Sequence, residues 1–133
     1  MSVSQLDDTP SPDGELAIQT LAMPASTNPR GDIFAGWLVS QMDLAGSVTA
    51  VKISRGRVAT VAMEGMDFLR AVPVGAIVSC YTKLLEVGRS SMSIGIEVWI
   101  NDQHTFEPVK VTDCVFVYVS IDERGRTRAI KTS

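Results

Sequence analysis

The stretch from Phe34 to about Lys52 is apolar on nearly every side when it is drawn as a helix. Its apolar residues are Trp37, Leu38, Val39, Met42, Leu44, Ala45, Val48 and Val51. A helix without a single apolar stripe must be surrounded by other elements of the protein. The stretch is almost long enough to span a bilayer, but Ser40, Gln41 and Asp43 lie near its middle. We therefore expect a buried helix of a globular domain and no membrane span.

The segments after this helix show the period-two alternation of β-strands, and a short apolar segment before it is compatible with a strand. A short candidate strand, Leu16–Met23, precedes the helix. The candidates after it are Arg57–Met63, Ala76–Val87, Met92–Ile100 and Val109–Ile121. Turn signals around Gly88 and Asn101 join the later strands as consecutive antiparallel hairpins. The sequence thus predicts an α+β domain in which a curved antiparallel sheet wraps around one long central helix.

The length of 133 residues and the apolar content of 45% suit a single domain with one core. We expect residues 1–14, with Pro10, Pro12 and Gly14, to form a flexible leader, and residues 15–133 to form the domain. The leader is polar and acidic, whereas a signal peptide has a basic region followed by an apolar one. A cytoplasmic location is therefore predicted.

Charge and cysteine usage exclude several functions. A net charge of −3 and a pI near 5.0 give no basic footprint for nucleic acid. Cys80 and Cys114 lie alone in predicted strands, without the spacing or the neighbouring histidines of a metal site, and read as small buried hydrophobic residues. The single histidine, His104, lies in a predicted hairpin tip, which argues against Ser-His or Cys-His catalysis.

Asp43 is the residue that fits its surroundings least. A carboxylate in an apolar helix is costly unless it is hydrogen-bonded or functional. The nearby polar residues Ser40, Gln41 and Ser47 are too few and too scattered to form an ion pair. Asp43 is therefore either a catalytic group or a buried structural acid, bridged by water or lying at an interface.

The segment before the helix carries strong turn chemistry, from Ala25 to Gly31. Asn28 is a candidate for an Asx turn and Asp32 for the N-cap of the helix.

Three runs, Thr20–Pro24, Thr27–Trp37 and Ser40–Asp43, closely resemble the YciA-type bacterial acyl-CoA thioesterases of the hot-dog superfamily. Further similar segments are Gly56–Val58, Phe68–Arg70, Pro73–Gly75, Val78–Tyr81, Val87–Ser91, Ile96–Trp99 and Tyr118–Val119. The resemblance covers roughly residues 16 to 128. In one respect the chain departs from the family pattern, because Ala35 stands where the first of two glycines is usual. If that position needs a positive φ or a close approach of the thioester, Ala35 would strain or narrow the site.

The resemblance implies a hot-dog fold and the hydrolysis of acyl-CoA to free CoA and a carboxylic acid, and we expect short- to medium-chain substrates. It implies that no separate cofactor or metal is required, because coenzyme A is bound as part of the substrate. It also implies a homodimer whose sheets join edge to edge, commonly assembled as a trimer of dimers, with active sites at the dimer interface.

Thioester hydrolysis needs a base or nucleophile and donors for the developing oxyanion. Asp43 is the candidate for the first role, and the unpaired backbone N–H groups near Ala35 and Gly36 are candidates for the second. Seven helical residues separate Gly36 from Asp43, which is about 10 Å along the axis. One subunit would struggle to supply both groups, and the resemblance implies that the carboxylate and the helix N-terminus come from different subunits.

Three polar residues have secondary or supporting roles in this scheme. Asn28 is a candidate catalytic residue beside its ordinary role in a turn. For Asp32, the resemblance implies a role in orienting the substrate or positioning water, beside its ordinary role as a cap. Thr60, on the first strand after the helix, could assist. Whether Asp43 acts as general base or as nucleophile is left open by the sequence.

The phosphates of coenzyme A require a local cationic patch on an acidic protein. The candidates are Arg57, Arg70, Arg89, Ser90 and Ser91. The segment Gly88–Ser91 could form a backbone nest for a phosphate. The alternative is a type I′ or longer hairpin with a solvated arginine.

Two other functions compete with hydrolysis. A hot-dog hydratase or dehydratase would normally use a histidine, and only His104 exists. A non-catalytic acyl-CoA sensor would usually carry an additional DNA-binding or partner domain, for which a chain of this length has no room.

Overall fold

The computed structural model describes residues 11–130, and the predicted leader up to Pro10 lies outside the described residues. The elements in chain order are β1 (Glu15–Leu21), the short 3-10 helix η1 (Pro24–Ser26), α2 (Ala35–Ser54), β2 (Val58–Glu64), β3 (Ile77–Val87), β4 (Ser91–Asn101) and β5 (Pro108–Ser120). The five predicted strands and the predicted helix are all present, with ends shifted by at most two residues. Within residues 11–130 no helix is both long and apolar enough to cross a membrane.

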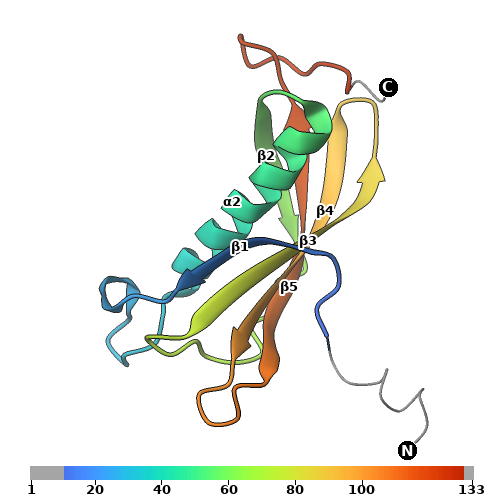
Figure 1. The fold of residues 1–133 in the computed structure, drawn as a ribbon. Coiled ribbons are helices and arrows are strands. Elements are labelled where there is room, and N and C mark those ends of the chain that lie inside the picture. Colours follow the sequence, from blue (N-terminus) through green and yellow to red (C-terminus); the bar gives the residue numbers. More distant parts are fainter. Residues whose placement is uncertain (1–10, 131–133) are drawn as a thin grey trace, which may run out of the picture.

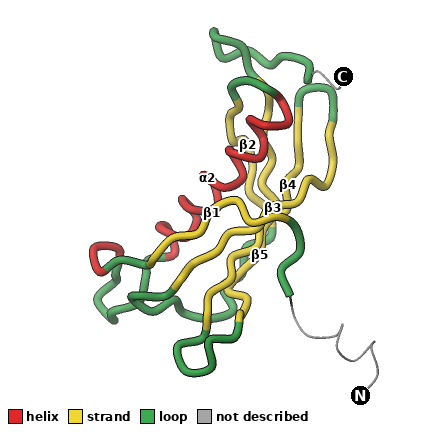
Figure 2. The backbone as a smooth tube through the Cα atoms, viewed as in Figure 1, coloured by secondary structure: helices red, strands yellow, loops and turns green. Residues whose placement is uncertain are grey.

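The five strands form one antiparallel sheet in the order β1-β3-β4-β5-β2 (Figures 1 and 2). As predicted, β3, β4 and β5 are consecutive hairpins. The helix α2 lies along one face of the sheet and contacts all five strands. A long helix held in the curve of an antiparallel sheet is the hot-dog fold. The edges of the sheet are β1 and β2.

The core lies between α2 and the sheet, and strict alternation builds it. In β4, Met92, Ile94 and Ile96 are fully buried, while the residues between them are only partly buried on the other face. The helix contributes Leu38, Met42, Ala45 and Ala50 to the same core. Because the period of β-strands is two, one register places the aliphatic residues Met92, Ile94, Ile96 and Val98 against the helix.

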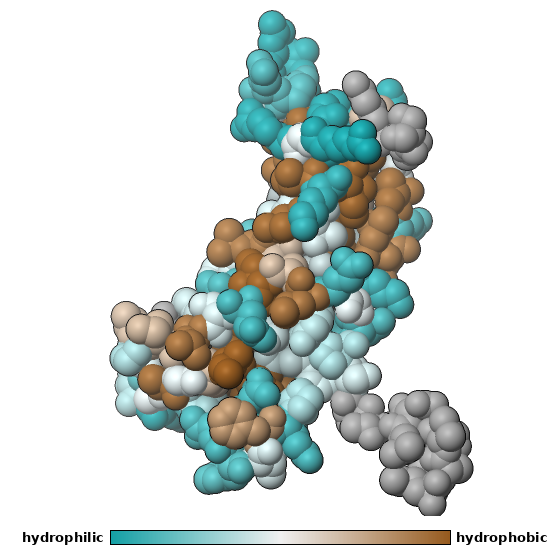
Figure 3. All heavy atoms as spheres, in the orientation of Figure 1, coloured by the Kyte–Doolittle hydropathy of each residue, from teal (hydrophilic) through white to brown (hydrophobic). Residues whose placement is uncertain are grey.

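The helix is less enclosed than the sequence predicts. Leu44, Val48 and Val51 are 55%, 41% and 43% exposed, so one side of α2 is uncovered by its own chain. Figure 3 shows hydrophobic residues gathered along the length of α2 on the visible face. The expectation of a fully surrounded helix is therefore wrong for the single chain, because the sheet reaches only one side.

The start of α2 also differs from the prediction. The N-cap residue is Phe34, which makes no side-chain capping bond, so Asp32 is not the N-cap. The backbone of Asp32 makes other contacts before the helix begins. Its N–H donates to the Asn28 side chain, and Asp32 forms a β-bridge with Pro73. These contacts hold Asp32 in the preceding loop and delay the start of the helix by two residues.

The C-terminal end of α2 is held by Arg128, a residue whose role the sequence alone did not indicate. Arg55 closes the helix in a left-handed conformation with φ of 58°. The guanidinium of Arg128 donates to the carbonyl of Ser54 at 3.2 Å and to that of Ile121 at 3.1 Å. A cation near the last carbonyls of a helix is favoured by the helix dipole. The segment after β5 thus folds back and fixes the end of α2.

Candidate active site

Asp43 lies half-buried in the middle of α2, and its carboxylate is held by hydroxyl groups. The Thr60 hydroxyl donates to Oδ1 at 2.7 Å, and the Tyr118 hydroxyl donates to the same oxygen at 3.1 Å. The Tyr118 hydroxyl also lies 3.2 Å from the backbone carbonyl of Asp43. Hydrogen bonds from two neutral donors stabilise the buried carboxylate in place of a cation. These hydrogen bonds accommodate a carboxylate inside an otherwise apolar helix.

The strand register explains why these two hydroxyls meet. Thr60 of β2 is directly opposite Tyr118 of β5, so both side chains point to the face of the sheet that α2 covers. Tyr118 is fully buried. Burial first, and then the negative charge of Asp43, raises the pKa of Tyr118. The phenol therefore stays protonated and acts as a donor.

The contact between Tyr118 and Asp43 could have been predicted from the sequence, although it was not. The alternation along β5 places Cys114, Phe116 and Tyr118 on the inward face. A buried tyrosine hydroxyl needs a polar partner. Asp43 is the only carboxylate on the helix that this face covers.

The N-terminus of α2 offers free backbone donors at the predicted place. The N–H groups of Trp37 and Leu38 both donate to the carbonyl of Phe34. Within residues 11–130, the N–H groups of Ala35 and Gly36 have no acceptor. Both residues are exposed, and a Cβ added at Gly36 would meet nothing within 4 Å. Ala35 is helical and not at positive φ, so the departure from two glycines causes no backbone strain.

The loop before α2 is organised by Asn28. Its side-chain oxygen accepts the N–H groups of Arg30 at 2.9 Å and Asp32 at 3.1 Å, and its own N–H donates to the Asp32 carbonyl. Gly31 takes φ of 84°, which suits glycine. The predicted Asx turn is confirmed. The amide nitrogen of Asn28 makes no hydrogen bond to any described residue.

A cleft of about 300 Å³ opens where this loop meets the helix N-terminus. Its lining includes the predicted residues Asn28, Asp32, Ala35 and Arg70, together with Arg30. Asp43 is not part of the lining. Since Asp43 lies about 10 Å further along α2, one chain holds two separate candidate half-sites, the carboxylate and the free backbone N–H groups.

The candidate phosphate-binding residues fall into two groups. Arg70 lies at the cleft and donates to the carbonyl of Lys110 at 3.0 Å. The other group lies at the opposite end of α2: Arg57 donates to the carbonyl of Glu123, and the β3–β4 hairpin pairs with the end of the chain through Arg89 and Ser90. Arg57 and Arg89 are exposed. The structure does not bring all five candidates together.

The β3–β4 hairpin has neither a type I′ turn nor a backbone nest. Both of these need a positive φ, and Gly88, Arg89, Ser90 and Ser91 all lie outside the positive-φ region. The prediction of a nest is therefore wrong, and the alternative of a longer hairpin with a solvated arginine is confirmed, because Arg89 is exposed. Any anion bound there must be held by side chains.

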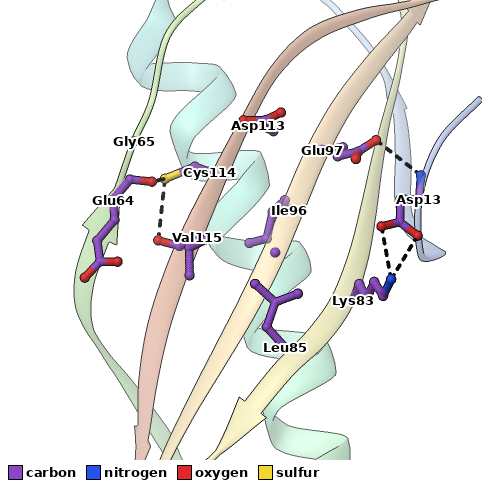
Figure 4. Close-up of a pocket in the computed structure, with 11 residues that line it drawn as sticks. Asp13, Glu64, Gly65, Lys83, Leu85, Ile96, Glu97, Asp113, Cys114 and Val115 are labelled. Carbon is purple, nitrogen blue, oxygen red and sulfur yellow. Dashed lines mark hydrogen bonds and ion pairs between the residues drawn. The ribbon is translucent and has the colours of Figure 1, made fainter. Parts of the chain in front are cut away.

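A second pocket, of about 330 Å³, lies on the face of the sheet away from α2 (Figure 4). Its lining includes four acidic residues, and three of them are paired: Asp13 with Lys83, and Glu97 and Asp113 with Lys110. It contains none of the predicted site residues. Its carboxylates would repel the phosphates of coenzyme A, so this pocket is a poor candidate for the active site.

The remaining titratable residues are explained by packing. Burial raises the pKa of Cys80 to about 12, so its thiol is protonated. Cys114 is buried and its Sγ donates to the Glu64 carbonyl at 3.0 Å. His104 is exposed in the β4–β5 hairpin, where its N–H donates to Asp102. The interpretation of the cysteines as buried hydrophobic residues and of His104 as a hairpin residue is confirmed.

Comparison with known proteins identifies the family of this chain. Residues 30–107 match the sequence model of the thioesterase superfamily. Acyl-CoA thioester hydrolase YciA of Salmonella typhimurium is 48% identical over 132 residues, which is 96% of this chain and 97% of that protein. Its Escherichia coli K12 counterpart is 50% identical over 123 residues, which is 90% of this chain and 92% of the relative.

Solved structures of related proteins have the same fold. A hexameric broad-specificity acyl-coenzyme A thioesterase superposes with a TM-score of 0.89 at 46% identity, over 93% of this chain and 86% of that one. A hexameric thioesterase from Yersinia pestis gives a TM-score of 0.88 at 46% identity, over 92% and 100% of the two chains. The fold thus has its counterparts among thioesterases. The chain belongs to the thioesterase superfamily and, within it, to the YciA-type acyl-CoA thioester hydrolases.

Replacing Asn28 by Asp separates its two roles. The carboxylate can still accept the N–H groups of Arg30 and Asp32, so the loop and the melting temperature should be retained. The free amide donor is lost and a negative charge enters the cleft, so kcat should fall about tenfold or more. Steady-state kinetics and thermal unfolding of Asn28→Asp check this. A wild-type kcat in this variant would show that Asn28 only stabilises the turn.

Proposed function

We propose that this protein hydrolyses acyl-CoA thioesters to free CoA and a carboxylic acid, at sites that two subunits build together. Asp43 of one subunit supplies the base or nucleophile, and the backbone at Ala35 and Gly36 of its partner supplies the oxyanion donors. The observation that carries the proposal is the Asp43 carboxylate, half-buried and held by hydroxyls without a cation. The YciA hydrolases, about half identical to this chain, support it.

The exposed edge of β2 is the proposed dimer contact. Val61 and Met63 on this edge strand are 57% and 49% exposed, and Leu44 on the adjacent helix is 55% exposed. An uncovered apolar edge strand is a template for pairing with a second chain. Two β2 edges related by a two-fold axis would join the sheets and place the two α2 helices side by side in opposite directions. The hexameric neighbours support assembly of such dimers into a trimer of dimers.

The half-sites provide the groups that the reaction needs. In the general-base route, Asp43 takes a proton from water while the water oxygen bonds to the thioester carbon, and the partner's N–H groups bind the oxyanion. The C–S bond then breaks, and the CoA thiolate leaves and takes up the proton. In the nucleophilic route, Asp43 itself bonds to the carbonyl carbon, CoA leaves, and water hydrolyses the resulting anhydride. Both routes use the same two half-sites.

The arginine-rich end of α2 is the proposed anchor for the CoA phosphates. Arg57, Arg89, Ser90 and Ser91 lie there, with the C-terminal segment that contains Arg128. Cationic side chains are needed because the whole chain carries a net charge of −3. Arg70, at the cleft, is placed to contact the substrate nearer its thioester.

Several finer points complete the proposal. Coenzyme A enters as part of the substrate and no further cofactor takes part, and short- to medium-chain acyl groups are the expected substrates. Within residues 11–130 no group of His, Cys, Asp or Glu could hold a metal ion. Asp32 orients substrate or water in the cleft. The catalytic domain spans residues 15–133 after a leader of 14 residues, and two free buried cysteines suit a reducing cytoplasm.

Asp43→Asn tests the function most directly. The amide keeps the shape of the side chain but cannot act as base or nucleophile, so kcat should fall by about 10²–10⁴ or more while the protein still folds. Release of CoA from a short acyl-CoA, followed with a thiol reagent, gives kcat. Asp113→Asn, which neutralises an exposed acid on the other face, should keep normal turnover. A folded Asp43→Asn enzyme with near-wild-type kcat would sink the mechanism.

Val61→Asp tests the shared site. A charge on the β2 edge should block pairing of the sheets, so the oligomer should dissociate and activity should be lost together with it. Sedimentation velocity and kinetics on the same samples measure both. Leu16→Asp, which places a charge on the opposite edge strand, is the control and should leave the β2 contact intact. A fully active monomer would refute the two-subunit site.

Arg89→Ala tests the phosphate anchor. Phosphate contacts far from the carbonyl bind substrate and transition state alike, so KM should rise while kcat stays nearly constant. Lys83→Ala, on the acidic outer face, should leave KM unchanged. An unaltered KM in Arg89→Ala, with CoA binding insensitive to salt, would remove Arg89 from the anchor.

A further inference from the structure

The two carboxylate oxygens of Asp43 have different surroundings. Oδ1 accepts hydrogen bonds from Thr60 at 2.7 Å and from Tyr118 at 3.1 Å. Within residues 11–130, Oδ2 accepts no hydrogen bond. One oxygen is therefore fixed by the protein, and the other has its lone pairs available for chemistry.

Tyr118 holds Asp43 at two points. Its hydroxyl lies 3.1 Å from Oδ1 and 3.2 Å from the backbone carbonyl of the same residue. A group that contacts both the side chain and the main chain of Asp43 fixes the orientation of the carboxylate relative to the helix. Tyr118 is fully buried in the core, behind Asp43, so it cannot reach the substrate. Burial, and then the charge of Asp43, raises the pKa of the phenol, which keeps the proton in place.

Gly46 makes room for this hydroxyl. A Cβ at position 46 would lie 2.1 Å from the Tyr118 oxygen, 2.7 Å from its Cζ and 2.8 Å from the Ile96 Cδ1. Gly46 is buried in the middle of α2, where glycine is destabilising relative to alanine. Its presence is explained by the phenol, which occupies the space that any side chain would fill. The helix and the strand are thus shaped together around this contact.

We propose, on the basis of the hydrolase function above, that Tyr118 is a positioning residue. With Thr60 it fixes Oδ1 of Asp43 and leaves Oδ2 as the oxygen that acts on water or on the thioester carbon. Gly46 contributes to the same arrangement, because its lack of a side chain lets the phenol pack against the helix one turn beyond Asp43.

The kinetic consequence follows from this geometry. Without the phenol, the carboxylate can rotate about a single remaining donor, and Oδ2 is no longer held toward the reacting carbon. A misplacement of this kind lowers the rate of the chemical step. Binding of the substrate should change little, since Tyr118 makes no contact with it.

Tyr118→Phe removes only the hydroxyl. We expect kcat to fall about tenfold or more, with KM within about twofold of the wild type. The acid limb of the profile of kcat/KM against pH should move to higher pH, because a carboxylate that loses a hydrogen-bond donor is protonated more readily. Loss of packing alone would not move this limb.

Thr82→Val is the matched control. Thr82 is 5% exposed and its hydroxyl forms a 2.7 Å hydrogen bond with Thr49 of α2, so it is also a buried contact between helix and sheet. It does not touch Asp43. We expect Thr82→Val to lower the melting temperature about as much as Tyr118→Phe does, and to leave kcat and the acid limb unchanged.

Gly46→Ala gives a second route to the same result. The added methyl group must displace the phenol, so this variant should reproduce the loss of kcat and the shifted acid limb with Tyr118 still present. It also decides the question if Tyr118→Phe does not fold.

Three results would overturn the inference. The first is a folded, normally assembled Tyr118→Phe enzyme with wild-type kcat and an unmoved acid limb. The second is a loss of kcat in Thr82→Val as large as that in Tyr118→Phe. The third is a Gly46→Ala enzyme with normal kinetics. Asp43→Asn separates this failure from that of the proposed function. If Asp43→Asn is inactive and Tyr118→Phe is normal, only the role of Tyr118 is refuted. If Asp43→Asn is active, the proposed catalytic role of Asp43 is itself refuted.

Discussion

The structure depends on holding one carboxylate inside an apolar helix. Within residues 11–130 Asp43 has no cation beside it, so hydroxyl donors from the sheet must offset its desolvation. This requirement fixes the register of β2 against β5, because Thr60 and Tyr118 must lie opposite each other. It also fixes the depth at which α2 lies on the sheet, through Gly46. A register shift follows directly after Thr60, where Val61 leaves the ladder, as is common beside active sites.

The uncovered side of α2 and the separation of the two half-sites have a common origin. A sheet of five strands can cover only one side of a helix that is apolar all round. In the proposed dimer the other side meets a second copy that runs in the opposite direction, which would bring a helix N-terminus toward Asp43. Apolar burial would then drive the assembly that completes the proposed site. Activity in such an arrangement depends on association, and a dissociated chain would hold a carboxylate without oxyanion donors.

The sequence was sufficient for the elements but not for contacts between distant segments. Period-two alternation and one helix apolar all round predicted every strand and the helix to within two residues. Asp43 stood out because a charge in an apolar run is costly. Tyr118 did not, since it reads as an ordinary inward aromatic residue and its partner lies 75 residues away. Arg128 was missed for the same reason, as it caps a helix that ends 74 residues earlier.

The local errors have local causes. Asp32 has the chemistry of an N-cap, but its backbone is already committed to the Asn28 turn and to the bridge with Pro73. The β3–β4 hairpin has a glycine at a position that suggests a primed turn, yet its residues keep negative φ. In both cases the residues favour the predicted local structure, but contacts with other segments stabilise a different one.

The direction of α2 also constrains how the proposed substrate can lie. The C-terminal end of a helix carries partial negative charge and disfavours phosphates, so an anchor there needs arginines. Arg57 and Arg89 supply them at this end, while Arg128 covers the last helical carbonyls. From Asp43 to Arg55 is twelve residues, about 18 Å along the axis. The long axis of a CoA thioester in the proposed site would therefore run along α2, with its phosphates at the arginine-rich end and its thioester between Asp43 and the partner's helix N-terminus. Acidic residues on the opposite face of the sheet would discourage any other placement of the phosphates.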